Sequence, residues 1–419
     1  MHDIISSEII CVGTELLLGQ IVNTNAAWLA RELGLMGINS YFQTVVGDNV
    51  ERLLGTLDLA ASRSDLVILT GGLGPTQDDL TMATVARYCR LPMQMHEPSR
   101  QAIEQYFLCF SRRHVTENNW KQAMMPQGAL VLPNTNGTAP GAIIEHKTDG
   151  GRQVVFVLLP GPPSEMHLMF DLAVRPYLET KISTVMRHVF VRMIGIGESA
   201  AETKLLDLIE SQHNPTLAPY ASEGEVMFRI TQSCASAGEE DRTGPLLDEV
   251  RKRLGEYIYE VGTRSLPEVV KDLLLSHNLT ASFAESCTGG LASAALTDFP
   301  GSSAIFSGSI VAYANTVKQI ILGVPEQILK DDGAVSENCA KAMATGCRNI
   351  MNTDYSVAVT GIAGPDGGTP EKPVGFVILA VAGPKGVTTR KLRIGGNRAR
   401  IRKVATLNVF DLLRREILA

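Results

Sequence analysis

Short apolar runs rich in Val, Ile and Leu alternate with amphipathic stretches along most of this chain. The strongest runs are DLVILTGG (65–72) and VVFVLLPG (154–161). Their apolar residues follow one another instead of alternating with polar ones, which is typical of strands covered by helices on both faces. The sequence therefore predicts an α/β fold built from βαβ units on parallel sheets.

The length and the change of pattern along the chain predict three domains. At roughly 150 residues per domain, 419 residues correspond to two or three. We expect a doubly wound sheet over residues 1–175, a small α+β module over 176–264 and a second α/β domain over 265–419.

Composition excludes several classes of function. The net charge of −6 argues against a nucleic-acid partner, and no uncharged apolar run approaches the length of a membrane span, so we expect no membrane partner. The seven scattered cysteines include no C-x-x-C pair, which argues against disulfides and structural zinc. The sequence predicts a reduced, cytoplasmic protein.

Four predicted strand ends of the first domain carry glycine, proline or polar residues. They are residues 13–15, 47–49, 71–81 and 159–166. Because ligands bind beyond the carboxyl ends of the strands in a doubly wound sheet, these four segments predict a site at one edge of the sheet.

The glycine-rich segment GGLGPTQDDLT (71–81) favours a phosphate ligand. Glycines let backbone N–H groups approach an anion, and the helix that follows adds favourable potential. Asp48, Asp78 and Asp79 have the oxygen ligands that Mg²⁺ or a similar divalent ion prefers. A tight turn with Asp79 as a simple helix cap is the alternative, and residue types alone weigh the two about equally.

Three motifs of this first domain, GTELLLGQIVNTN (13–25), GGLGPTQDDLT (71–81) and LPGPPSEM (159–166), resemble the CinA family, whose N-terminal domain is related to molybdopterin-binding domains. The resemblance implies metal-dependent hydrolysis of ADP-ribose to AMP and ribose 5-phosphate, with Asp48 and Asp79 as the functional acids. Molybdopterin binding without catalysis is the alternative. The substrate-binding residues that it implies are Glu15, Asn25, Gly71, Gly72, Gly74, Thr76, Thr81 and Glu165.

The last domain contains several hydroxyl groups and one well-placed lysine. An alcohol nucleophile needs a base, and Lys318 is the nearest candidate by chain order, since burial would lower its pKa. Ser303 lies in a turn before a predicted strand, Lys318 in the helix after it, and Tyr313 near the strand's end. Taken singly, such a serine is usually a cap and such a lysine is usually solvated. Cys287 is interpreted as a small buried hydrophobe.

The motifs AESCTGG (284–290), PGSS (300–303), TGIAGPDGG (360–368) and GNRARIR (396–402) resemble the C-terminal domain of CinA, the nicotinamide mononucleotide deamidase family. The resemblance covers residues 266–419 and implies a Ser/Lys amidohydrolase that needs no cofactor, releases ammonia and forms nicotinate mononucleotide. The site residues that it implies are the nucleophile Ser303, the base Lys318, the assisting phenol Tyr313, the hydroxyls of Ser286 and Thr360, the glycines Gly289, Gly290 and Gly364, and one arginine, Arg398, with Arg400 and Arg402 as alternatives. The sequence leaves open which glycine loop binds phosphate and which stabilises an oxyanion.

Together these features predict a bifunctional pyridine-nucleotide recycling hydrolase that acts on nicotinamide mononucleotide and ADP-ribose and assembles as a homo-oligomer, a dimer. The alternatives are a non-catalytic competence or recombination adaptor and a molybdopterin-binding protein. DNA binding through the middle, KH-like module is argued against by that module's excess of acidic residues.

Overall fold

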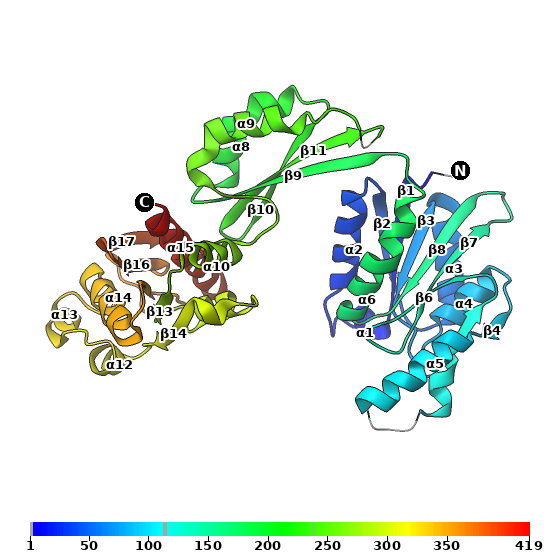
Figure 1. The fold of residues 1–419 in the computed structure, drawn as a ribbon, viewed down its shortest axis with the longest axis horizontal. Helices are drawn as coiled ribbons and strands as arrows, with labels where there is room; N and C mark the ends of the chain where they lie inside the picture. The colour runs from blue at the N-terminus through cyan, green and yellow to red at the C-terminus, as the bar shows by residue number, and fades with distance from the viewer. Residues whose placement is uncertain (1–2, 112–114, 237) are drawn as a thin grey trace. The chain divides into compact units, whose positions relative to one another are not determined.

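A computed structural model describes residues 3–111, 115–236 and 238–419. The chain divides into two units, residues 1–187 with 233–240 and residues 188–232 with 241–419. Each unit is described by itself below (Figure 1). In these described ranges, no helix combines the length and the apolar character needed to cross a membrane.

The first unit contains a six-stranded mixed sheet, in which the first four strands pair in parallel and each of the last two pairs antiparallel with the strand before it. The central strand β3 is buried at every position, as its uninterrupted apolar sequence predicts. In sheet order the strands are β2 (Asn39–Val46), β1 (Ser6–Val12), β3 (Leu66–Thr70), β8 (Gln153–Leu159), β7 (Gly141–Lys147) and β6 (Leu130–Leu132).

Helices cover both faces of this sheet, which confirms the doubly wound prediction. Leu29 and Phe170 belong to one buried cluster, and Leu57 and Val85 belong to the other, on the opposite face. Leu178 also lies in the first cluster, so this core extends past residue 175. The first face carries α2 (Thr24–Leu35), α6 (Pro163–Met169), the π-helix η3 (Phe170–Val174) and α7 (Arg175–Glu179); the second carries α3 (Val50–Arg63) and α4 (Thr81–Tyr88).

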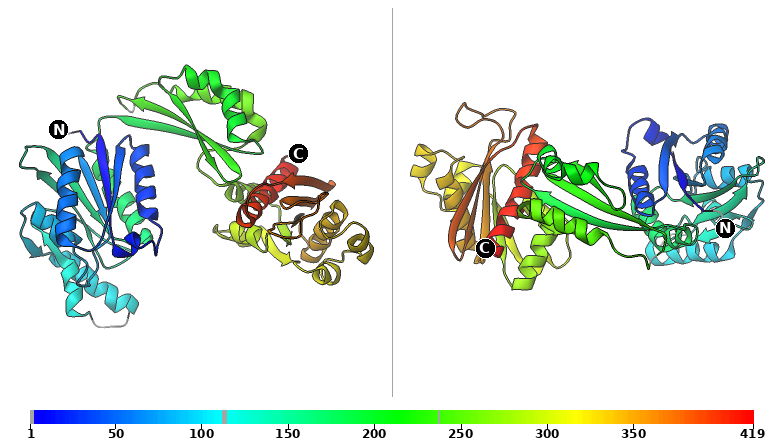
Figure 2. Two further views of the ribbon diagram at one scale, coloured as in Figure 1. Left: turned by 180° about the vertical axis from the view of Figure 1, so that it is seen from behind. Right: turned by 90° about the horizontal axis from the view of Figure 1, so that it is seen from above.

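A segment between α4 and β6 contains short elements that the periodicity does not predict. In Figures 1 and 2 it lies beyond the carboxyl ends of the parallel strands. Its elements are β4 (Met93–Met95), α5 (Glu97–Tyr106), η1 (Phe107–Ser111), η2 (Glu117–Ala123) and β5 (Met124–Pro126), and a further one-turn helix, α1 (Thr14–Leu17), follows β1.

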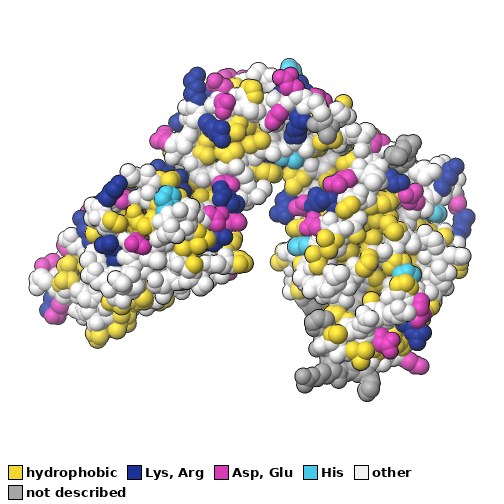
Figure 3. Space-filling view, in the orientation of Figure 1, with side chains coloured by type: hydrophobic (Ala, Val, Ile, Leu, Met, Phe, Trp, Pro, Cys, Tyr) yellow, Lys and Arg dark blue, Asp and Glu magenta, His cyan; other side chains and the backbone are white. Residues whose placement is uncertain are grey.

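The middle of the chain forms a four-stranded sheet with two helices packed on one face, confirming the predicted α+β module. On the face drawn in Figure 3, acidic and basic side chains are interspersed over this module. In sheet order its strands are β10 (Thr216–Ser222), β11 (Glu225–Cys234), β9 (Val185–Ile194) and β12 (Ile258–Val261). Its two α-helices are α8 (Glu198–Glu210) and α9 (Thr243–Leu254), and the short 3-10 helix η4 (Gly255–Tyr257) follows α9.

The last domain is built on a five-stranded sheet, in which the first three strands pair in parallel and each of the last two pairs antiparallel with the strand before it. In order these are β14 (Phe306–Val311), β13 (Ala281–Glu285), β15 (Tyr355–Gly361), β16 (Phe376–Gly383) and β17 (Gly386–Arg393). One face is covered by the helices α10 (Leu266–His277), α11 (Leu291–Thr297) and α15 (Arg398–Leu418), and the other face by α14 (Glu337–Met351). The short elements of this domain are η5 (Ser302–Ala304), α12 (Asn315–Ile320) and α13 (Glu326–Asp331).

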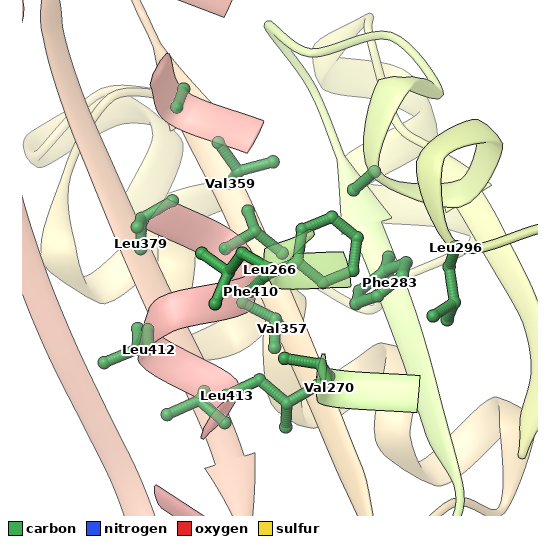
Figure 4. Packing of buried hydrophobic residues seen from close by; sticks show 14 of the residues in the cluster. Leu266, Val270, Phe283, Leu296, Val357, Val359, Leu379, Phe410, Leu412 and Leu413 are labelled. Carbon is green, nitrogen blue, oxygen red and sulfur yellow. The ribbon is translucent and has the colours of Figure 1, made fainter. Parts of the chain in front are cut away.

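Aromatic packing fixes α15 against this sheet (Figure 4). The rings of Phe283 and Phe410 meet edge to face, with centroids 5.8 Å apart. Ile194 and Tyr259 of the middle module belong to the same buried cluster. The middle module therefore keeps a core of its own and also places two residues in the core of the last domain.

Candidate active sites

Lys318 occupies an unusual position for a charged residue of the last domain, because its side chain is only 1% exposed. Its Nζ lies 2.7 Å from the Ala312 carbonyl oxygen, 3.2 Å from the Tyr313 carbonyl oxygen and 3.1 Å from Ser286 Oγ. Burial lowers the pKa of this amine. The two carbonyl groups can only accept hydrogen bonds. A neutral amine in this position donates its two hydrogens to them, which leaves its lone pair directed at the serine hydroxyl.

Ser286 occupies the first position after β13, and its backbone N–H donates to the Val359 carbonyl at 3.0 Å. The preceding residue, Glu285, is completely buried and accepts hydrogen bonds from the first turn of α11. Gly289 and Gly290 have φ values of +60° and +96°, which glycine adopts easily. Ser286 is thus fixed between a strand and a capped helix. Sequence reasoning missed Glu285, because one carboxylate before a glycine loop has no distinctive pattern.

The expected pair of Ser303 and Lys318 is not formed, which corrects the nucleophile predicted from the sequence. Ser303 is exposed in η5, and none of the three Lys318 partners is Ser303. The parallel register of β13 and β14 gives the reason, because Glu285 pairs with Val311 at the carboxyl ends of both strands. Ser303 precedes β14 and therefore belongs to the opposite end of that strand.

The Tyr313 hydroxyl does not connect a serine to Lys318, which corrects the predicted relay. It accepts a hydrogen bond from Arg398 Nη2 at 2.8 Å, and its side chain is 59% exposed. Arg398 Nη1 also donates to the Gly364 carbonyl at 2.7 Å. Tyr313, Arg398 and the TGIAGPDGG loop (360–368) therefore form one connected wall near the serine and lysine.

The other two arginines have different partners. Arg402 donates to the carbonyls of Cys287 and Thr288 at 3.1 and 2.7 Å, so it holds the loop that follows Ser286. Arg400 is exposed and donates to the Gly395 carbonyl at 3.0 Å. Of the three candidates, Arg398 is the one bonded to Tyr313 and to the glycine loop.

Two further residues of these motifs are committed to the fold. Thr360 is buried on the central strand β15, and its hydroxyl donates to the Ala334 carbonyl at 2.8 Å, a structural contact in place of the predicted active-site role. Cys287 is buried as well, and burial raises the pKa of its thiol to about 11. A protonated, inaccessible thiol is a poor nucleophile, in agreement with the structural role inferred from the sequence.

The first unit contains a cavity of about 560 Å³ at the carboxyl ends of its parallel strands. All four predicted loops contribute to it, so the site lies where the strand ends place it. The predicted residues that line it are Glu15, Asn25, Asp48, Gly71, Gly72, Gly74, Asp78, Asp79 and Glu165.

Neighbouring hydroxyl groups hold the aspartates of this cavity. Asp48 accepts hydrogen bonds from the Thr14 backbone N–H at 3.0 Å and the Thr14 hydroxyl at 2.7 Å. Thr76 bonds in the same way to Asp79 and also contacts Asp78, whose pKa the Thr76 hydroxyl lowers.

Thr76 and Thr81, both expected to bind substrate, are not among the residues that line the cavity. Thr76 is bonded to the two aspartates of its own loop. Thr81 is buried and donates to the Gly71 carbonyl at 2.8 Å. Both threonines therefore shape the glycine-rich loop, a correction to the role predicted for them.

The carboxylates of the cavity do not form a complete metal cage. In residues 3–111, 115–236 and 238–419, no three His, Cys, Asp or Glu side chains are grouped to hold a metal ion. The predicted three-carboxylate site of Asp48, Asp78 and Asp79 is therefore not formed by the protein alone. Mg²⁺, however, is usually held by one or two carboxylates together with substrate phosphates and water. The donor set fits that shared mode of binding.

Two amide side chains escaped sequence reasoning, one that lines this cavity and one that contacts Glu165 beside it. Gln122 comes from η2, is 5% exposed and lines the cavity with an Oε1 atom that accepts no hydrogen bond from the described residues. Asn134 donates from Nδ2 to Glu165 Oε2 at 2.6 Å. Neither lies in a recognisable motif. Only the three-dimensional structure brings them to the strand ends.

Comparison with known families assigns all three parts of the chain. Residues 8–180 match the family described as "Probable molybdopterin binding domain", residues 188–259 match "Damage-inducible protein CinA KH domain", and residues 263–417 match "CinA C-terminal domain". These ranges agree with the three-domain layout.

Relatives match over nearly the whole chain. A "CinA-like protein" of Dictyoglomus turgidum is 51% identical over 414 residues, which cover 98% of this chain and 99% of that protein. A "Putative competence-damage inducible protein" of Acetivibrio thermocellus is 47% identical and covers 99% of both chains. The crystal structure of the competence/damage inducible protein CihA from Agrobacterium tumefaciens is 38% identical, with a TM-score of 0.35, and covers 37% of this chain and 97% of that one. With the fold and both sites in place, the two relatives that match over nearly the whole chain show that it belongs to the CinA family.

Proposed function

We propose that the last domain is an amidohydrolase that deamidates nicotinamide mononucleotide to nicotinate mononucleotide. The observation that carries this proposal is the buried contact between Lys318 Nζ and Ser286 Oγ. No described residue forms an ion pair with Lys318, and its two other partners are carbonyl oxygens. Such an environment favours a neutral lysine, which is the form that can accept a proton.

The proposed reaction begins when Ser286 Oγ attacks the carboxamide carbon and Lys318 Nζ takes the hydroxyl proton. Lys318 then gives this proton to the departing nitrogen, ammonia leaves, and water hydrolyses the acyl-serine ester. Arg398 is suited to an anionic part of the substrate, because its guanidinium lies beside Tyr313 and the glycine loop. A non-catalytic adaptor has no need of a buried serine–lysine pair.

The direct test is to incubate the full chain with nicotinamide mononucleotide and to measure both ammonia and nicotinate mononucleotide. We expect the two products in equal amounts and without added metal. Absence of both products at high enzyme concentration contradicts the proposal.

We infer a second activity for the cavity of the first unit, the metal-dependent hydrolysis of ADP-ribose to AMP and ribose 5-phosphate. The supporting observation is the charge of the cavity wall, since its lining residues include five acidic side chains and no Lys, Arg or His. A pyrophosphate is repelled by such a wall unless a cation accompanies it. Asp48 and Asp79 would hold a divalent ion, which would neutralise charge on the phosphate oxygens.

Two amide oxygens support a ligand with hydroxyl groups in the same cavity. Gln122 Oε1 and Asn25 Oδ1 are buried and accept no hydrogen bond from the described residues. A buried acceptor without a donor costs about 1–3 kcal/mol, and ribose hydroxyls are suitable donors. The test is AMP release from ADP-ribose with Mg²⁺, Mn²⁺ or Co²⁺. Tight pterin binding without AMP release would favour the molybdopterin alternative.

A further inference from the structure

Glu165 differs from the other acids of the first unit's cavity in the way its carboxyl group is held. Its Oε2 accepts a hydrogen bond from Asn134 Nδ2 at 2.6 Å. The same Nδ2 donates to the Ala139 carbonyl at 2.9 Å, and Asn134 Oδ1 accepts from the Asn136 N–H at 3.0 Å. Both ends of the amide are therefore engaged, and Asn134 cannot turn its oxygen toward Glu165.

The backbone is also shaped to receive this carboxyl group. A Cβ atom on Gly137 would lie 2.2 Å from Glu165 Oε2, which is far inside van der Waals contact. Only glycine at this position allows the carboxyl group to lie against the loop. Asn134 and Gly137 together fix one carboxyl oxygen, while the other, Oε1, accepts no hydrogen bond from the described residues.

Three of the four other acids that line the cavity, the aspartates, are held by donors of their own. Asp48 is bonded to Thr14, and Asp78 and Asp79 are bonded to Thr76. Burial raises the pKa of Glu165, whereas the Thr76 hydroxyl lowers the pKa of Asp78. When two environments in one site separate the pKa values of carboxyl groups in this way, the groups are suited to different roles. The charged side chains that line the cavity around Glu165 are Glu15, Asp48, Asp78 and Asp79.

We propose that Glu165 is the general base of this cavity and that its Oε1 accepts a proton from the water that attacks the pyrophosphate. This inference rests on the proposed hydrolysis of ADP-ribose. The water oxygen forms a bond to one phosphorus, the bond from that phosphorus to the bridging oxygen breaks, and the water proton passes to Glu165. The leaving phosphate or solvent then receives the proton, so that one water and one ADP-ribose give AMP and ribose 5-phosphate.

The test compares the full chain with Glu165→Gln, measuring AMP release over a range of pH at a fixed concentration of Mg²⁺. We expect kcat to fall by about 10²- to 10⁴-fold, the usual contribution of a general base. KM and the affinity for ADP-ribose, measured by calorimetry, are expected to stay within about threefold of the original values because the side chain keeps its size. Glu179→Gln is the matched control, since Glu179 is exposed on α7 and does not line the cavity.

A second variant separates proton transfer from simple positioning. A base acts only when ionised, so kcat in the original protein is expected to rise with pH through the raised pKa of Glu165. Asn134→Ala removes the hydrogen bond that favours the ionised form, so this rise is expected to move to higher pH. A residue with a purely structural role would change the height of the profile and leave its position unchanged.

Each outcome distinguishes the inference from the activity on which it depends. If the original protein releases AMP and Glu165→Gln retains its kcat or the same rise with pH, Glu165 is not the base, although the activity stands. If the original protein releases no AMP with any of the three metals, the proposed hydrolysis and the role of Glu165 fall together.

Discussion

The side-chain nitrogen of Lys318 lies 3.1 Å from the hydroxyl oxygen of Ser286, in a contact that excludes solvent. The two residues are 32 positions apart in the chain and meet because β13 and β14 end side by side. This contact gives the candidate amidohydrolase a base and a nucleophile without any histidine.

The first prediction distinguishes the two candidate serines. Ser286→Ala is expected to lower ammonia release from nicotinamide mononucleotide to the background rate, because the attacking oxygen is removed. Ser303→Ala is expected to retain most of the rate, since Ser303 has no contact with Lys318. Each variant is assayed for ammonia, with circular dichroism to check folding. The reverse result would restore Ser303 as the nucleophile.

The second prediction concerns pH. Burial lowers the pKa of Lys318, and only the neutral amine accepts a proton. The value of kcat/KM for deamidation is therefore expected to rise with pH through a pKa below the ordinary lysine value of about 10.4 and then to level off. Lys318→Arg stays protonated, so it is expected to lose about 10²- to 10⁴-fold in rate at every pH. A flat profile for the original protein contradicts this role.

The third prediction separates the three arginines by kinetics. Arg398→Ala is expected to raise KM at least about tenfold, because a lost charged hydrogen bond costs about 1.5–3 kcal/mol. Arg402→Ala is expected to lower kcat, because the carbonyls of Cys287 and Thr288 lose their donor and the loop beside Ser286 is released. Arg400→Ala is expected to change neither constant. An increase in KM for Arg400→Ala alone would transfer substrate binding to that residue.

The fourth prediction uses metal removal to separate the two sites. EDTA is expected to abolish AMP release from ADP-ribose and to leave ammonia release unchanged, since the described residues around Ser286 and Lys318 include no cluster of three side chains that could hold a metal ion. Asp79→Ala is expected to have the same selective effect, because Asp79 lines the cavity of the first unit and does not belong to the last domain. Both reactions are measured on one preparation of the full chain. Loss of both activities in EDTA would mean that the sites depend on each other.

Most of the fold could be predicted because apolar periodicity reports burial directly. The strands β3 and β8 are continuous apolar runs, and the helices α2 and α14 present apolar stripes to the cores. The edge strand β17 was missed because its sequence, GVTTRKLR, is polar and largely exposed. The elements between α4 and β6 were missed for a related reason, since they are short and bury few apolar residues.

The candidate sites were only partly predictable, because residues far apart in the chain are brought together only by the fold. Motifs identified the correct loops, but chain order suggested Ser303 as the partner of Lys318, whereas strand register selects Ser286. The sequence near the C-terminus is also rich in Lys and Arg, a composition that by itself predicts a patch attracting phosphate. In the structure, Arg390, Arg414 and Arg415 bond to the buried Asp411. Charge counted along a sequence does not reveal which charges neutralise each other.

The shared core of Ile194, Tyr259 and Phe283 joins the middle module to the last domain. Arg415 strengthens the connection by donating to the Glu256 carbonyl at 3.1 Å. A cut near residue 265 would uncover apolar side chains on both fragments, and apolar exposure costs about 25 cal/mol per Å². The middle module and the last domain are therefore expected to unfold together in one cooperative step. The three domains would then correspond to two units of unfolding.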